Sequence, residues 1–398
     1  MVDWFDAVVM ANGHHSVPNL PHPRSYPGQD SFGGKIIHSS EYKRDTILDV
    51  GHKENNILVV GSGNCAVDIA CDLSSSSSSS SSVRVFLSLR QSMGLFFPKY
   101  IAGKAFDHVI TIRYWFILFV PKFIRPWFSG LLKYRLIRFM KAAYGGPAIW
   151  GLDHRWKTNA YFAKRLGVTI HQDLLARIGS GAIEIVPGIT SFEKGSSSCG
   201  AVHGSVPEVL PSVQFTNGIR RQMNTVIFCT GYRPHFPFLS RDLIPTLKDR
   251  YELFKQMIPP EHPTLAFVGL LQTCCFFPTV EMRARWLVAH WSMQVLPSSA
   301  TMRHEINRVP RSSFHNRLYH GEGGEYLNDL AEDIGCAPLF LSFFALVSFL
   351  SIPDNVGISF SLLLFYLSYR LFDPKNPWVL NHILRVCGEM QRGGVHHN

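Results

Sequence analysis

The sequence predicts an α/β fold built around a Rossmann-like dinucleotide-binding unit, and three observations support this. An apolar strand at residues 57–60 runs directly into the glycine-rich segment 61–66, and a helical pattern follows at 67–73. A second apolar strand at 83–90 comes after a run of nine serines. With 398 residues, of which 46% are hydrophobic and 17% charged, the chain can bury a large core.

The segment Gly61-Ser62-Gly63-Asn64-Cys65-Ala66 predicts a pyrophosphate site. Gly61 permits the tight turn, Gly63 lets backbone N–H groups approach the phosphates, and the small Ala66 lets helix and strand pack closely. The helix N-terminus adds partial positive charge. A lone glycine motif is weak evidence, but its place between strand and helix makes it specific. We predict that the cofactor-binding residues of this segment are Gly61, Gly63, Asn64, Cys65, Ala66, Val67 and Asp68.

The end of the second strand favours NADP over NAD. It reads Ser88-Leu89-Arg90 and lacks the acid that hydrogen-bonds the ribose hydroxyls of NAD. An arginine and a hydroxyl suit a 2′-phosphate instead, so Ser88 and Arg90 join the predicted site. The alternative for Arg90 is an ordinary solvated arginine. Asp68 lies in the first turns of the helix, where we expect it to interact with the helix dipole or a neighbouring loop.

Other elements follow in order along the chain. Short apolar strands ending near a glycine are predicted at 5–11, 226–229 and 265–268, and an irregular hairpin at 192–214. Residues 16–31, rich in Pro, Ser and Gly, indicate a linker. The formal charge of +10 suits nucleic acid, an anionic membrane or a phosphorylated cofactor, and no zinc-finger or RRM signature favours nucleic acid. The eight cysteines form no CxxC pair, and neither a metal cluster nor a catalytic residue is predicted.

Two apolar regions raise the question of membrane contact. Residues 339–352 are almost unbroken apolar, 353–355 interrupt, and 356–372 resume. A spanning helix needs about 20 residues, so a re-entrant hairpin or monotopic anchor, one kinked span and a buried helix pair all stay open. Residues 109–140 alternate aromatic and basic positions, which fits either a partly buried helix pair or an interfacial one.

The residues also resemble a known family. Residues 32–42 match FxGxxxHxxxY through Phe32, Gly34, His38 and Tyr42, a pattern similar to the fingerprint of class B flavin monooxygenases. The loop at 61–66 then resembles the family's nicotinamide loop, with Cys65 where serine is usual, and 228–232 resembles its ATGY element. Residues 262–270 and 277–286 are similar to its C-terminal flavin-domain segments. Within the group, the chain resembles flavin-containing monooxygenases more than Baeyer–Villiger enzymes.

The resemblance implies an NADP-binding domain inserted in an FAD-binding Rossmann-like domain, here incomplete, with a hydrophobic C-terminal tail. The implied parts are 1–42, a remnant of the first FAD-domain half with the fingerprint linker; 43–222, the NADP domain; 223–335, the C-terminal part of the FAD domain; and 336–398, a membrane-associated tail. Thr230, Gly231 and Tyr232 would form a hinge and complete the predicted cofactor-binding set. Phe32 and His38 would be structural, with His38 supporting the linker.

The implied function is monooxygenation with NADP and FAD as cofactors. NADPH reduces FAD, O2 adds to give a C4a-hydroperoxyflavin, and an amine or sulfide substrate takes one oxygen atom. The implied location is the cytosolic face of the endoplasmic reticulum membrane, reached through the tail, with the cytoplasm as the alternative.

One departure leads us to expect a truncated chain. The family places a GxGxxG loop for FAD well over a hundred residues ahead of the second loop, whereas only 60 residues precede Gly61 here. We therefore expect missing strands beside Phe5–Ala11 and beside the sheet around Val226–Phe228. The alternative function is an inactive fragment or paralogue that binds NADP but not FAD; an NADP-dependent reductase without flavin is weaker, since no Tyr-x-x-x-Lys pair stands out.

Overall fold

The computed structural model forms two compact units, each described here by itself. The sheet unit comprises His14–Tyr100 and Lys133–Phe236, and the helix unit comprises Met1–Gly13, Ile101–Leu132 and Pro237–Asn398. The structure describes residues 3–13, 15–48, 54–75, 82–89, 95–101, 104–105, 138, 168–195, 211–243, 246–247, 250–270, 276–308 and 323–336.

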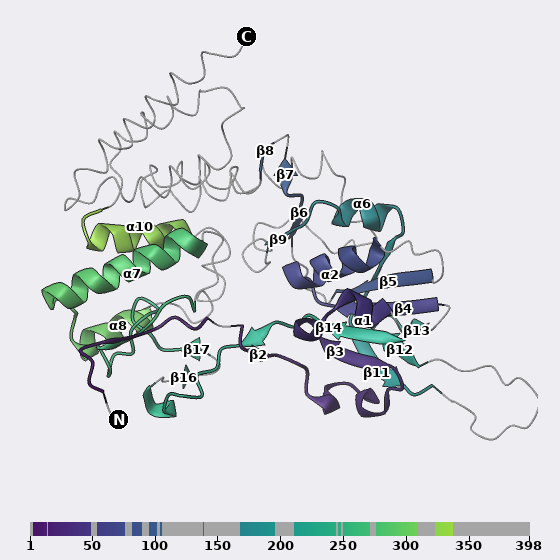
Figure 1. Ribbon diagram of the computed structural model, residues 1–398, viewed down its shortest axis with the longest axis horizontal. Coiled ribbons are helices and arrows are strands. Elements are labelled where there is room, and N and C mark those ends of the chain that lie inside the picture. Colours follow the sequence, from purple (N-terminus) through teal and green to yellow (C-terminus); the bar gives the residue numbers. More distant parts are fainter. Residues whose placement is uncertain are drawn as a thin grey trace, which may run out of the picture. The chain divides into compact units, whose positions relative to one another are not determined.

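A five-stranded parallel sheet forms the centre of the sheet unit (Figure 1). Its spatial order is β10 (Ile183–Val186), β5 (Ser82–Ser88), β4 (Glu54–Val60), β14 (Thr225–Phe228) and β3 (Lys35–His38). Every residue of β14 is buried. A parallel sheet is covered on both faces, so its inner strands contain apolar runs, as residues 57–60 of β4 and 226–228 of β14 do.

Alternate residues of these strands enter two different cores. Ile57, Val59 and Ile227 pack with helix α2 (Asn64–Ser74) on one face. Leu58 and Val226 belong to the core of the opposite face. There the antiparallel sheet of β11 (Ile189–Glu193), β12 (Ser212–Phe215) and β13 (Arg220–Gln222) contributes its buried side chains. The period of two along a strand produces this three-layer arrangement, and β11 with β12 confirms the expected hairpin.

Within the sheet around Val226–Phe228, the expectation of missing neighbours is wrong for strand β14 itself. β14 pairs with β4 on one side and with β3 on the other, through Phe228↔Val60 and Phe228↔His38. Both neighbouring strands come from this chain, so β14 has no unpaired edge. β3 lies before residue 43 and β14 after residue 222, so the compact sheet unit has wider bounds than the expected NADP domain.

Shorter elements complete the sheet unit. β2 (Val17–Pro18) pairs antiparallel with β15 (Tyr232–Arg233), and β6 (Leu95–Phe97) pairs parallel with β9 (Val168–Ile170). The remaining bounds are η1 (Pro23–Ser25), η2 (Gln29–Ser31), η3 (Ser39–Glu41), α1 (Arg44–Leu48) and α6 (Leu174–Gly179). The two-residue strands β7 (Tyr100–Ile101) and β8 (Lys104–Ala105) pair with each other and begin where the first segment of the sheet unit ends, at Tyr100.

The helix unit joins the first described strand to the last. β1 (Val8–Met10) pairs parallel with β18 (Leu265–Phe267), which confirms the strands expected at both places. Helices α7 (Phe276–Met293), α8 (Ser299–Arg308) and α10 (Gly323–Asp333) share one core with residues following β17. The other bounds are η5 (Arg241–Leu243), β16 (Thr246–Leu247) and β17 (Arg250–Tyr251).

Three sequence predictions lie outside the described residues. They are Arg90, most of the aromatic and basic stretch at 109–140, and the apolar tail from residue 337 onward. Within the described ranges, no helix combines the length and the apolar character needed to cross a membrane.

Candidate functional site

The loop between β4 and α2 lies at the carboxyl edge of the sheet, where the strand order changes direction. From β4 the sheet continues through β5 on one side and through β14 on the other. Val60, Ser88 and Phe228 stand level at the ends of these three strands. In open α/β sheets, ligands bind in the crevice outside the carboxyl ends of the strands at such a switch point.

Gly61 is locked between the ends of the three strands. Its N–H donates to Ser88 O at 3.2 Å, and the neighbouring Cys229 N donates to Val60 O at 2.9 Å. Its φ of +145° lies in a region that side chains rarely adopt, and an added Cβ would lie 2.7 Å from Cys229 O. Only glycine fits this turn without strain, as the motif predicted.

Gly63 stands at the open end of the loop, as the N-cap of α2. Gly63, Asn64 and Cys65 are exposed, and an added Cβ at Gly63 would meet no atom of the described residues within 4 Å. As a glycine, the N-cap residue has no side chain that could cap the helix. The first N–H groups of a helix lack intrahelical acceptors, so this end offers donors and partial positive charge to an anion. Ala66 is fully buried behind it, as expected for close packing.

Strand β9 supports the loop from outside the five-stranded sheet, and the sequence reasoning missed it. The Thr169 hydroxyl donates to Ser62 O at 2.6 Å, and Ile170 N donates to Asn64 Oδ1 at 3.3 Å. Thr169 is 3% exposed. Its only sequence signal is a short β-branched run, which is typical of any strand.

Asp68 interacts with a neighbouring loop, one of the two expected arrangements. Its carboxylate lies 3.7 Å from His171 Nε2, just beyond β9. Burial lowers the pKa of His171, while the Asp68 carboxylate acts in the opposite direction. The Asp68 carboxylate is exposed, whereas the His171 imidazole is largely buried.

Two further residues of the predicted set are internal. Val67 is fully buried, and its N–H donates to Gly63 O at 3.2 Å. Ser88 is 2% exposed, and its hydroxyl donates to Pro187 O at 2.8 Å. The side chains of both residues therefore lie in the interior beside the site and are not exposed at its surface.

Thr230, Gly231 and Tyr232 lie where β14 leaves the sheet toward the strand pair β2–β15. The Thr230 hydroxyl donates to Asn19 O at 2.6 Å, and Asn19 N donates to Gly231 O at 2.9 Å. The fully buried His38 reaches the same Gly231 O through Nε2 at 3.0 Å, while its Nδ1 accepts from Ser40 N. The imidazole also packs edge-on against Tyr232. His38 thus supports the linker, the role expected of it.

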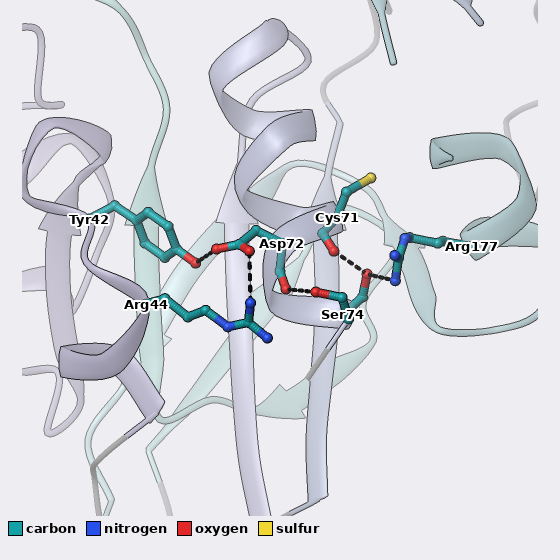
Figure 2. A network of polar contacts seen from close by, with 7 residues as sticks. Tyr42, Arg44, Cys71, Asp72, Ser74 and Arg177 are labelled. Carbon is teal, nitrogen blue, oxygen red and sulfur yellow. Dashed lines mark hydrogen bonds and ion pairs between the residues drawn. The ribbon is translucent and has the colours of Figure 1, made fainter. Parts of the chain in front are cut away.

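Tyr42 joins the fingerprint segment to helix α2 (Figure 2). Its hydroxyl donates to Asp72 Oδ2 at 2.7 Å, and Arg44 Nη1 contacts Asp72 Oδ1 at 3.1 Å. Burial and the Asp72 carboxylate raise the pKa of Tyr42. Two residues further along α2, Ser74 Oγ accepts a hydrogen bond from Arg177 at 3.1 Å. The C-terminal end of α2 is therefore fixed from two sides.

Three described cysteines flank the loop or helix α2. Cys65 is exposed at the start of α2, whereas Cys71 is buried within it. Cys229 is half-buried beside Gly61. Burial raises the pKa of Cys71 and of Cys229 to about 12 each, so both thiols stay protonated at neutral pH.

Comparisons with known proteins show the family to which the chain is similar. The family model described as flavin-binding monooxygenase-like matches residues 1–353. Dimethylaniline monooxygenase [N-oxide-forming] 2 of Cavia porcellus is 30% identical over 355 residues, covering 85% of this chain and 58% of the relative; that of Mus musculus is 31% identical, covering 85% and 59%. The solved S-allyl-L-cysteine S-oxygenase of Allium sativum is 19% identical with a TM-score of 0.49, covering 93% of this chain and 64% of that one. The chain spans slightly under three fifths of the length of the curated relatives it matches.

Proposed function

This chain belongs to the flavin-binding monooxygenase-like family, and from that premise we propose that it binds NADPH at the loop 61–66. We further propose that it acts with FAD to transfer one oxygen atom of O2 to a soft nitrogen or sulfur nucleophile. The observation that carries the NADPH half is the open end of α2 at the switch point between β4 and β14. The oxidative half rests on the family.

The residues of the loop fit a pyrophosphate. Gly63 leaves the approach open, and the exposed backbone of Asn64 and Cys65 would hold the phosphates through N–H groups and the helix dipole. Gly61 and Ala66 would bring β4 and α2 together behind them. We propose Arg90 as the partner of the 2′-phosphate, from its place after the second strand.

Family members use FAD together with NADPH. When bound, NADPH supplies a hydride and FAD activates O2. In the described ranges, no second strand leads into a Gly-x-Gly-x-x-Ala loop, so no described residue is assigned to hold FAD. The contribution proposed for this chain's own residues is to hold the pyrophosphate and to fix the path of the linker through His38 and Gly231.

The proposed substrate class is a tertiary amine or a thioether. The amine follows the curated relatives, which are named as N-oxide-forming dimethylaniline monooxygenases. We also propose attachment to the cytosolic face of the endoplasmic reticulum membrane, with the cytoplasm as the alternative, from the resemblance and from the apolar sequence at 339–372. Fractionation of cells that express the full chain tests the attachment, which requires the chain to sediment with the membranes.

The decisive experiment uses the purified full chain with FAD, NADPH and dimethylaniline. The proposal requires NADP+ binding by calorimetry, retention of flavin by absorbance, and formation of the N-oxide by mass spectrometry. Binding of NADP+ without flavin or product would instead establish the alternative, an NADP-binding protein that does not oxidise. Lack of NADP+ binding would overturn both.

A further inference from the structure

We propose that Thr169 is a positioning residue for the dinucleotide: through Ser62 it aims a backbone N–H of the loop at the cofactor's pyrophosphate. The inference rests on the proposed NADPH site. It concerns a residue 107 positions away from Ser62 that belongs to neither the glycine motif nor the central sheet.

The first step is the direction of one peptide plane. The Thr169 hydroxyl holds Ser62 O at 2.6 Å. In a trans peptide, the C=O and the N–H of the same unit point in opposite directions. Since Ser62 O points at β9, the N–H of Gly63 points away from β9. Gly63 is exposed, and among the described residues no atom lies within 4 Å of where a Cβ would be.

The second step is electrostatic. A carbonyl oxygen carries partial negative charge, so a Ser62 carbonyl turned toward the phosphates would repel them. The hydrogen bond from Thr169 keeps this oxygen on the opposite side of the loop. Because Thr169 is 3% exposed, water has little access to replace its hydroxyl. With the Thr169 hydroxyl in place, the loop presents N–H donors to the phosphates. Without it, the Ser62 carbonyl can turn and present an acceptor instead.

The third step is that β9 holds the loop at a second point. Ile170 N donates to Asn64 Oδ1 at 3.3 Å, so two consecutive β9 residues contact both sides of Gly63. Parallel pairing of β9 with β6 fixes the strand that makes these contacts. Thr169 thus acts on the ligand through the loop backbone and needs no contact of its own with the cofactor.

The test compares two ligands on the purified full chain. NADP+ contains the pyrophosphate, whereas adenosine 2′-monophosphate carries the adenosine and the 2′-phosphate without it. Thr169→Val removes the hydroxyl at nearly constant shape, and Thr169→Ser keeps it. Loss of one such hydrogen bond predicts that Thr169→Val binds NADP+ about tenfold more weakly, with unchanged affinity for the monophosphate. Thr169→Ser should bind NADP+ within about twofold of wild type.

The controls make the result specific. Thr190→Val places the same change on an exposed position of β11 and should leave both affinities unchanged. If Thr169→Val does not fold, Thr169→Ala carries the same comparison. Unchanged NADP+ affinity in the variant lacking the hydroxyl, or equal weakening of both ligands, would overturn this inference alone. Failure of the wild-type chain to bind NADP+ would overturn the proposed function together with it.

Discussion

The imidazole of His38 contacts the carbonyl oxygen of Gly231 at 3.0 Å, across 193 positions of sequence. Nδ1 of the ring accepts a hydrogen bond from Ser40 N, and Nε2 contacts Gly231 O in the segment that leaves β14. Because His38 is completely buried, losing the ring would remove the acceptor of Ser40 N and one of the two donors to Gly231 O, the other being Asn19 N. The contact gives the histidine of the fingerprint a structural role, because it joins β3 to the segment that follows β14.

We expect His38→Ala to lower the free energy of unfolding by about 2 kcal/mol, since two hydrogen bonds of a buried side chain are lost. Chemical denaturation followed by circular dichroism measures the change. His235→Ala is the matched control, because His235 is exposed on the same segment. Equal stability of the two variants would show that the His38 contacts do not hold the linker.

The two loop glycines should respond differently to the same added methyl group. In Gly61→Ala the new Cβ would lie 2.7 Å from Cys229 O at a φ of +145°, so we expect a loss of at least about 2 kcal/mol in unfolding free energy. In Gly63→Ala the Cβ meets nothing, and the loss should stay within about 1 kcal/mol. Calorimetric titration should nevertheless show roughly tenfold weaker NADP+ binding for Gly63→Ala, because its methyl group lies on the approach to the N–H donors. Wild-type affinity in Gly63→Ala would place the phosphates elsewhere.

Tyr42 should stabilise helix α2 more than Arg44 does, although both contact Asp72. The Tyr42 hydroxyl donates at 2.7 Å to a carboxylate, whereas the Arg44–Asp72 pair has about two fifths of each side chain exposed to screening solvent. We expect Tyr42→Phe to cost about 1.5 kcal/mol and Arg44→Met less than about 1 kcal/mol. Thermal unfolding of the two variants side by side gives the ranking, and the reverse order would contradict the assignment.

How much of this could be predicted from the sequence depends on distance along the chain. β4, the loop, α2 and β5 are consecutive, and each carries its own pattern, so their types and order were predicted within a few residues. The sequence does not predict that β14 lies between β4 and β3, because parallel pairing of residues 225–228 with 35–38 leaves no local signal.

The residues of the candidate site likewise include some that the sequence predicts and others that it does not. The roles of Gly61, Gly63 and Ala66 follow from backbone geometry that the motif encodes, and the structure places them accordingly. Thr169 belongs to no motif, and its contact with Ser62 joins residues 107 positions apart in the sequence. The strand position of Ser88 predicts that it lies at the site. It does not predict that the Ser88 hydroxyl donates a hydrogen bond to Pro187 O.

Thiol reactivity should distinguish the three cysteines near α2. With iodoacetamide at pH 8, we expect rapid modification of the exposed Cys65 and protection of Cys71 and Cys229, because burial restricts access and their raised pKa values keep them protonated. Peptide mass spectrometry identifies the labelled positions, and unfolded chain gives the reference rate for each. NADP+ should slow the labelling of Cys65 if the phosphates occupy the start of α2. Equal rates with and without NADP+ would argue against that placement.

The raised pKa of Cys229 also predicts a loss of stability in alkali. A thiol ionises at its ordinary pKa of 9.0 in the unfolded chain but at about 12 in the folded one. Between these values the unfolded state releases its proton first, so the stabilising contribution is complete below pH 9 and falls as pH rises toward 12. The upper limit of this loss is about 1.4 kcal/mol per pH unit, and partial exposure of Cys229 reduces it. Unfolding free energies measured from pH 8 to 10.5 should therefore fall less steeply in Cys229→Ala than in wild type. Cys65→Ala, at an exposed position, should follow the wild-type slope, and identical slopes for all three chains would refute the assignment.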